Sequence, residues 1–281
     1  MKALFDQSSY ICSKELTKVY STSFSWCINL LPPTVRKHIF GIYGFVRLAD
    51  EIVDSFHGYE QEKMLNNLED ELAFALKNGI SINPIIHSFV QVVHQFGLDD
   101  FIYPFLKSMR QDLYKKDYIT NDEYNEYIYG SADVVGLMCL KVFVKGNQEN
   151  FNELKPFAMK LGSAFQKVNF LRDMKDDKLT LGRSYFPSIV DGTFDHQSKM
   201  TIINEIKHDF DVALQGIAKL PTEVRFGVFL AYRYYLALLK KIERSSLKSI
   251  LTQRIRVPNN EKSLILLKSY LVYTFKRKSL C

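Results

Sequence analysis

Apolar residues recur every three or four positions along almost the whole chain, which is the spacing of helices that bury one face. The pattern is interrupted at Pro32-Pro33, Gly58, Gly79 and Gly97. Proline suits the first turn of a helix and glycine commonly follows the last, so these are expected helix boundaries. The pattern predicts helices over 8–31, 34–56, 60–77, 84–96, 101–116, 121–145, 150–177, 195–218, 221–246 and 260–276. Strand signals are nearly absent, so the predicted fold class is all-α.

The expected connections are short, as in a compact helical bundle. The longest irregular stretch is 180–187, where a loop could close over a site. With 281 residues, 47% hydrophobic and 14% aromatic, the chain can bury a large core. We therefore expect one domain over 1–281.

Cysteine usage and the chain start indicate a cytoplasmic setting. The cysteines Cys12, Cys27, Cys139 and Cys281 have no CxxC spacing, which favours reduced thiols and argues against zinc. The first residues lack the apolar run of a signal peptide, and no stretch has the 18 or more apolar residues of a membrane span. We expect a soluble cytoplasmic protein.

The net charge of +6 comes from Lys and Arg spread along the chain, without the aromatic-interleaved basic blocks typical of nucleic-acid binding. One exception is the apolar segment 264–275, which is followed by Lys276, Arg277 and Lys278. An apolar helix with a basic tip could rest on anionic lipid at the inner face of the membrane. Core packing with a solvated tail is the alternative interpretation.

Two pairs of aspartates at helical spacing lie about 120 residues apart in apolar segments. Asp50 and Asp54 share one helix face, as do Asp173 and Asp177. Like charges at this spacing repel, so a fold that points both pairs into one cavity needs cations between them. Oxygen ligation suits Mg²⁺, with water and substrate phosphates completing the coordination. The implied substrate is a diphosphate.

Other polar residues accompany the aspartates at helical spacing. Arg47 and Tyr43 lie one and two turns before the first pair, respectively, while Gln166 and Asn169 share a stripe with the second. Buried among apolar residues, such side chains need partners, and a metal diphosphate is one. The arginines Arg47, Arg172 and Arg183 could bind phosphate oxygens through bidentate contacts, or neutralise the adjacent carboxylates as structural ion pairs.

These residues also carry a resemblance. The segment 43–54 resembles the first aspartate-rich motif of the squalene and phytoene synthases, and Gln166-x-x-Asn169-x-x-Arg172-Asp173-x-x-x-Asp177 matches the second. The likeness extends to 21–24, 127–136, 183–187 and, more loosely, 235–243, so it covers about residues 10–260.

The resemblance implies a helical bundle around a central cavity, of the class I isoprenoid synthase type, that joins two allylic diphosphates head to head. It implies catalytic roles for Tyr43, Arg47, Asp50, Asp54, Arg172, Asp173 and Asp177. Two or more Mg²⁺ ions, for which Mn²⁺ could substitute, would be bound by Asp50, Asp54, Asn169, Asp173 and Asp177. Substrate contacts would come from Ser21, Ser23, Phe24, Tyr127, Ala132, Val135, Gly136, Gln166, Asn169, Arg183, Tyr185 and Tyr235.

Water would quench the carbocation that such a reaction forms. Apolar walls would exclude it and offer ring faces to positive charge. We expect these walls from Phe24, Phe45, Val135, Met138, Phe165 and Phe170, for each of which ordinary core packing is the alternative. Tyr43, Tyr127 and Tyr235 could hydrogen-bond diphosphate or steer the proton.

The chain departs from the family pattern at two positions. Asp133 stands where many relatives carry Gly, and Thr22 stands where some carry Lys. The first would place an extra carboxylate near the substrate channel, and the second removes a phosphate contact.

The segment 127–138 looks most like bacterial phytoene synthases, which use C20 geranylgeranyl diphosphate. Condensation of C15 farnesyl diphosphate to dehydrosqualene or squalene is the close alternative. No Gly-x-Gly-x-x-Gly follows a strand, so we expect no NADPH.

Two interpretations from other classes stay open. A di-iron carboxylate bundle would use the acid-to-histidine spacings Asp54-x-x-His57 and Glu205-x-x-His208. A non-catalytic assembly factor on the same fold would have lost its aspartates, and both pairs are intact here.

Overall fold

The computed structural model describes residues 2–177, 182–190 and 194–275. In these ranges the chain is built from helices, with one isolated bridge between Asp117 and Ser184 and no strand. The elements are α1 (Lys2–Tyr20), α2 (Thr22–Asn29), α3 (Pro33–Asp54), α4 (Gln61–Asn78), α5 (Pro84–Phe96), α6 (Asp99–Gln111), α7 (Asn121–Ile128), the π-helical turn η1 (Tyr129–Asp133), α8 (Val134–Phe143), α9 (Gln148–Asp176), α10 (Pro187–Val190), α11 (His196–Lys219), α12 (Thr222–Arg244), α13 (Leu247–Thr252) and α14 (Asn259–Phe275). The predicted all-α class is confirmed.

The first predicted helix, 8–31, is wrong, because it is two helices. Ser21 has an extended backbone (φ −144°), and its side chain accepts a hydrogen bond from the backbone N–H of Phe24. A serine in this position satisfies an N–H group that the first turn of a helix leaves unpaired. The extended backbone of Ser21 therefore ends α1, and its hydroxyl caps the first turn of α2.

The predicted helix 121–145 differs from the structure as well. It begins at Asn121, with a capping box between Thr120 and Glu123, but contains the π-helical turn η1 and ends at Phe143. The short helices α10 and α13 were not predicted. The helix predicted over 101–116 ends earlier, at Gln111, and the first helix begins earlier than predicted, at Lys2. The other boundaries agree within about two residues, and position 276 of the last predicted helix lies outside the described residues.

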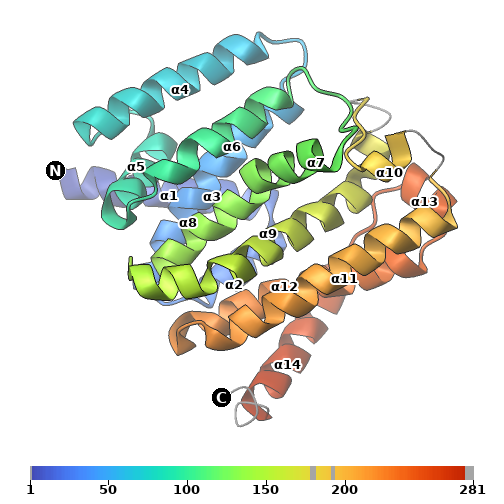
Figure 1. Ribbon diagram of the computed structural model, residues 1–281. Coiled ribbons are helices and arrows are strands. Elements are labelled where there is room, and N and C mark those ends of the chain that lie inside the picture. Colours follow the sequence, from blue (N-terminus) through green and yellow to red (C-terminus); the bar gives the residue numbers. More distant parts are fainter. Residues whose placement is uncertain (1, 178–181, 191–193, 276–281) are drawn as a thin grey trace.

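The long helix α9 lies in the middle of the bundle, between α8 and α11 (Figure 1). A Cβ atom at Gly162 of α9 would lie 2.9 Å from the backbone oxygen of Ala132, so glycine lets η1 approach α9 closely. One apolar core joins α3, α4, α5, α6 and α8, and another joins α7, α9, α11 and α12. Phe24 packs against both. The candidate site lies between these two cores.

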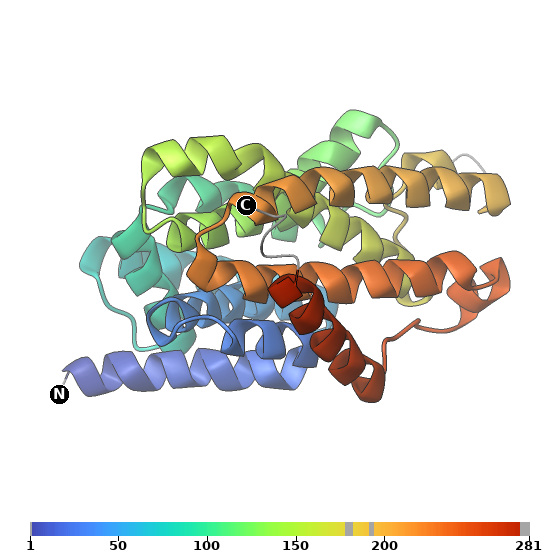
Figure 2. The same cartoon turned by 90° about the horizontal axis from the view of Figure 1, so that it is seen from below.

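The helix α14 crosses α12 at the surface (Figure 2). Among the described residues, no helix is long and apolar enough to cross a bilayer. The cysteines Cys12, Cys27 and Cys139 are free thiols, and Cys281 lies outside the described residues.

Candidate active site

A cavity of about 740 Å³ runs alongside α9 between the two cores. Its lining on α9 recurs at helical spacing from Leu154 to Asp176. At one end, which we call the mouth, it is lined by Asp50, Asp54, Asp173, Asp176 and Asp177. At the other end, which we call the floor, it is lined by Leu140, Phe143, Leu154, Phe157, Ile217 and Leu220. The cavity is therefore charged at its mouth and apolar at its floor.

The first acidic pair lies on the last turns of α3. Arg47 Nη1 lies 2.6 Å from Asp50 Oδ2, and the same guanidinium also pairs with Glu51. Its Cζ atom lies 4.2 Å from the centroid of the Tyr20 ring, a cation–π contact that α1 contributes. Arg47 thus reaches the mouth as an ion-pair partner of the carboxylates, held between two helices.

The second acidic pair lies at the end of α9. Arg172 Nε donates to Asp173 Oδ1 over 2.9 Å. Arg254, in the segment between α13 and α14, approaches the same oxygen with its Nε at 2.8 Å. Two arginines therefore surround Asp173, one of them from a part of the chain that the sequence analysis did not single out.

Arg183 joins the two acidic segments. Its Nη1 lies 2.7 Å from Asp54 Oδ1, and its backbone N–H donates to the backbone oxygen of Asp177. Burial, followed by the charges of Asp173 and Asp54, raises the pKa of Asp177 to about 8. Burial and the charge of Asp54 likewise raise the pKa of Asp50 to about 7. Carboxylates from the two acidic pairs therefore lie close enough to repel one another in one mouth.

This donor set suits a hard divalent cation, which prefers oxygen ligands and would relieve the repulsion. In the described residues, however, no group of three or more His, Cys, Asp or Glu side chains is arranged to hold a metal ion. Arginine ion pairs hold several of the aspartates instead. The chemistry of the donors fits Mg²⁺, and the ligation geometry stays a prediction.

Asp112, at the end of α6, was missed by the sequence analysis. It is buried behind the mouth, where it accepts a hydrogen bond of 2.8 Å from the Tyr127 hydroxyl. Its backbone oxygen accepts one of 2.6 Å from Arg183 Nη2, and the Tyr185 hydroxyl lies 3.3 Å from Arg183 Nη1. Burial raises the pKa of Asp112 well above its usual range. Asp112 thus positions an arginine that reaches Asp54.

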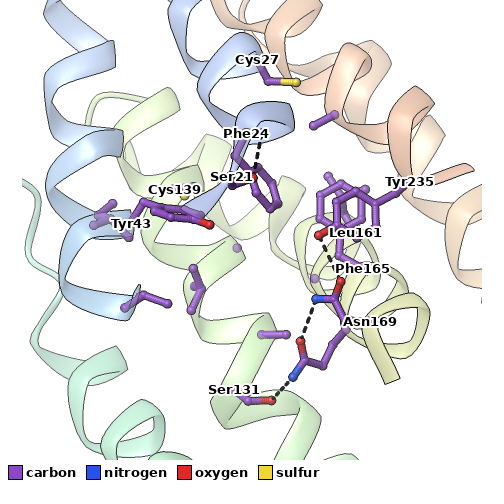
Figure 3. A pocket seen from close by; sticks show the side chains of 18 of the residues that line it. Ser21, Phe24, Cys27, Tyr43, Ser131, Cys139, Leu161, Phe165, Asn169 and Tyr235 are labelled. Carbon is purple, nitrogen blue, oxygen red and sulfur yellow. Dashed lines mark hydrogen bonds between the residues drawn. The ribbon is translucent and has the colours of Figure 1, made fainter. Parts of the chain in front are cut away.

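A chain of polar contacts follows the stripe on α9 (Figure 3). Gln166 Nε2 lies 3.4 Å from Ser131 Oγ, and Asn169 Nδ2 lies 3.4 Å from Gln166 Oε1. The Tyr235 hydroxyl donates to Asn169 Oδ1 over 3.2 Å. These side chains satisfy one another along one side of the cavity, within reach of a ligand at the mouth.

Aromatic rings line the cavity below this chain of contacts. The Phe165 and Tyr235 rings stack with centroids 4.0 Å apart, and the Phe24 ring lies 5.7 Å from Tyr235 and 5.5 Å from Tyr43. Val135 and Phe170 line the cavity, as predicted.

The predicted wall positions of Phe45 and Met138 are wrong, because both side chains are fully buried in the core. Phe45 stacks on Phe89 of α5 with centroids 4.1 Å apart, on the side of α3 that faces away from the cavity. Helix α3 is buried on more than one side, so its apolar pattern does not distinguish the side that faces the cavity from the side that faces the core.

The remaining predicted residues are placed as follows. Ser21, Tyr127, Ala132, Gly136, Gln166, Asn169 and Tyr185 line the cavity, whereas Ser23 is not among its lining residues. Asp133, expected near the substrate channel, follows the lining residue Ala132 but is not itself among the lining residues, and its carboxylate accepts a hydrogen bond from Ser163. Thr22 is exposed, and its hydroxyl accepts a hydrogen bond of 2.6 Å from Lys262.

The di-iron interpretation finds no support. Asp54 is the last residue of α3 and His57 follows in a turn, so the two do not share a helix. Glu205 pairs with Lys167.

Solved structures of two proteins share this architecture. A dehydrosqualene synthase superposes with a TM-score of 0.82 over 96% of this chain and 98% of its own, at 21% identity. The squalene synthase HpnC from Alicyclobacillus acidocaldarius gives 0.73 over 85% and 94%, at 22% identity. The fold is that of the isoprenoid synthases.

Sequence comparison gives the family. The family model for squalene/phytoene synthase matches residues 17–190. A phytoene synthase of Arthrospira platensis is 30% identical over 92% of this chain and 91% of its own, and a 15-cis-phytoene synthase of a Synechocystis strain is 28% identical over 92% and 84%. The chain belongs to the squalene/phytoene synthase family. Membership supports a divalent-metal-dependent prenyltransferase of the phytoene synthase type, consistent with prenyl diphosphate substrates.

Proposed function

We propose that this protein joins two molecules of geranylgeranyl diphosphate head to head to give phytoene, the first committed step of carotenoid synthesis. The first diphosphate leaves as its C–O bond breaks, and the double bond of the second substrate attacks the allylic cation. Loss of a proton then closes the ring to give a cyclopropylcarbinyl diphosphate. A second C–O cleavage, rearrangement and proton loss complete the product. The observation that carries the proposal is one cavity with carboxylates and arginines from α3 and α9 at its mouth and an apolar floor.

The mouth supplies what a leaving diphosphate needs. Mg²⁺ held by Asp50, Asp54, Asn169, Asp173 and Asp177 would neutralise charge as it develops on the diphosphate. The guanidinium groups of Arg47, Arg172 and Arg254 already lie among these carboxylates. Their planar donors match phosphate oxygens, so we expect each to exchange part of its carboxylate contact for the substrate.

The aromatic part of the cavity protects the cation. The ring centroids of Phe24, Phe165 and Tyr235 lie within 6.1 Å of one another, and the three rings line the cavity between its mouth and its floor. Their faces attract positive charge and their bulk excludes water. Because the Tyr235 hydroxyl is engaged with Asn169, it also holds that amide toward the mouth.

The test is incubation of the purified protein with C15 and with C20 diphosphate, with and without Mg²⁺ and NADPH, followed by identification of the hydrocarbon. We expect phytoene from the C20 substrate with Mg²⁺, and the same product when NADPH is present. Asp173→Asn should abolish turnover while the helical circular dichroism persists. The exposed Asp70→Asn on α4 is the matched control. Absence of any head-to-head product would refute the proposal and favour a non-catalytic role.

We also propose that the protein works in the cytoplasm, with α14 resting on the inner face of the membrane. Leu264, Leu267, Leu271 and Phe275 form one exposed stripe at spacings of three and four. The opposite face of α14 packs on the bundle. Lys268 flanks the stripe, so an anionic surface would complement it.

Vesicle sedimentation tests this contact. We expect binding to vesicles that contain phosphatidylglycerol and weaker binding to phosphatidylcholine alone. Replacing Leu267 and Leu271 by Ser should release the protein from vesicles without lowering its turnover in detergent. Equal sedimentation of this variant and the wild type would exclude α14 as the contact.

A further inference from the structure

The cavity has a depth that can be read along α9. Its lining positions on this helix include Asn169 near the mouth and Phe157 at the floor. Twelve residues separate them, and an α-helix rises about 1.5 Å per residue, so the floor lies about 18 Å below Asn169. The side chains on η1 and α8 that face this stretch are small near the mouth and larger toward the floor, from Ala132 to Phe143.

Phe157 is held in place from behind. A Cβ atom added to Gly216 of α11 would lie 2.7 Å from Phe157 Cγ and closer still to its Cβ. The Phe157 side chain therefore lies directly on the bare backbone of α11. The Lys219 ammonium lies 5.4 Å from the ring centroid and also pairs with Glu153. The backbone of α11 at Gly216 therefore blocks movement of the Phe157 side chain away from a ligand in the cavity.

We propose that Phe157 determines which length of prenyl chain the cavity prefers in its substrate, and that the depth of the cavity matches a C20 chain. The main chain of a C20 prenyl group has about fifteen carbon–carbon bonds, which at about 1.2 Å per bond of an extended chain span about 18 Å. A C15 group spans about 13 Å on the same basis. It would end near Leu161, one turn of α9 above Phe157, and leave the floor unfilled. This inference rests on the proposed head-to-head condensation and adds its substrate-length determinant.

Apolar contact at the floor is the physical basis of the selectivity. Of the two substrates, only the C20 chain is long enough to bury its last isoprene unit against Phe157, Phe143 and Leu220. Removing apolar surface from water is favourable, and each carbon added to a matching pocket strengthens discrimination. A larger side chain at position 157 would shorten the cavity, and a smaller one would extend it toward α11.

The experiment is a competition between equimolar C15 and C20 diphosphates, with C30 and C40 hydrocarbons quantified by chromatography. We expect the wild type to favour the C40 product. Phe157→Trp should lower the ratio of C40 to C30 product at least tenfold while turnover of the C15 substrate stays within threefold of wild type. Phe157→Ala should raise turnover of a C25 prenyl diphosphate at least tenfold.

The matched control is Phe151→Leu, on the same helix but packed in the core outside the cavity, which should leave the product ratio unchanged. If Phe157→Trp does not fold, the C25 result of Phe157→Ala decides the matter. An unchanged C40 to C30 ratio in folded Phe157→Trp, or no gain with C25 in Phe157→Ala, would overturn the role of Phe157. A wild type that makes only C30 product would overturn the match to C20 but leave head-to-head condensation standing. No turnover of either substrate would overturn the proposed function itself.

Discussion

The mouth of the cavity should be a place where loss of a carboxylate stabilises the fold and destroys activity. Asp177 is the best position to test this, because burial and the charges of Asp173 and Asp54 together raise its pKa to about 8. In Asp177→Asn a neutral amide of nearly the same shape replaces a group that ionises only against repulsion. We expect the metal-free variant to be more stable than the wild type at pH 8.

The sign of the pH dependence follows from linkage. With a raised pKa, the folded state binds the proton of Asp177 more tightly than the unfolded state. The stability that this gives is fully present below the unfolded pKa of about 3.8, and it is lost as the pH rises through about 8. The gain from Asp177→Asn should therefore be small at pH 5 and large at pH 8.

The magnitude has an upper limit. One pKa unit corresponds to about 1.4 kcal/mol, so a shift from 3.8 to about 8 could cost at most roughly 6 kcal/mol. Water and counterions at the partly open mouth screen the repulsion, and we expect about 1–3 kcal/mol. For a chain of this size that is a rise in Tm of roughly 2–10 °C.

The assay is thermal unfolding in EDTA at pH 5 and pH 8, with the exposed Asp70→Asn as control. Adding Mg²⁺ at pH 8 should raise the Tm of the wild type more than that of Asp177→Asn, since a ligand stabilises the state that binds it. Turnover by the variant should be nearly abolished. A variant that is less stable than the wild type at pH 8 in EDTA would show that Asp177 is a structural ion-pair partner, and the reasoning on repulsion would be refuted.

Three further predictions concern residues around the mouth and the core. Asp112→Ala should lower kcat about tenfold or more and stability by about 1–3 kcal/mol, because it unpairs the Tyr127 hydroxyl and removes a carboxylate oxygen that lies 3.8 Å from Arg183 Nη1; steady-state kinetics and thermal unfolding check both, and unchanged kinetics would remove Asp112 from the site. Arg172→Lys should slow turnover at saturating substrate because a bidentate donor is lost, and an unchanged kcat would assign Arg172 to structure. Phe45→Ala should cost about 3–5 kcal/mol in chemical denaturation yet leave the product unchanged, and a changed product would place Phe45 back at the cavity.

Local spacing allowed the sequence to predict much of the helical fold and the acidic pairs. The positions i and i+4 share a helix face whatever the rest of the fold does, so the pairing of Asp50 with Asp54 needed no tertiary information. Both pairs were predicted to meet, and both line one cavity.

Contacts between distant segments were not predictable in this way. Asp112 is a single acid at a helix end, and its partner Arg183 lies 71 residues further on. Arg254 is 81 residues from Asp173 and stands in a segment without a motif. Nothing in the flanking sequence distinguishes Asp112 or Arg254 from a charged residue on the surface. They acquire a role only because α6 and the segment between α13 and α14 pack against the mouth.

The π-helical turn η1 decides which side chain α7 presents to the cavity. A helix advances about 100° per residue, so the extra residue of a π turn rotates all that precedes it by about that angle. In a continuous α-helix the position one turn before Ala132 would be that of Ile128, whereas here Tyr127 lines the cavity and Ile128 is buried in the core. One inserted residue has therefore exchanged an alkyl group for a phenol that reaches Asp112. Shortening η1 by one residue would turn the Tyr127 phenol away from the cavity and break its contact with Asp112, although every functional residue would remain in the sequence.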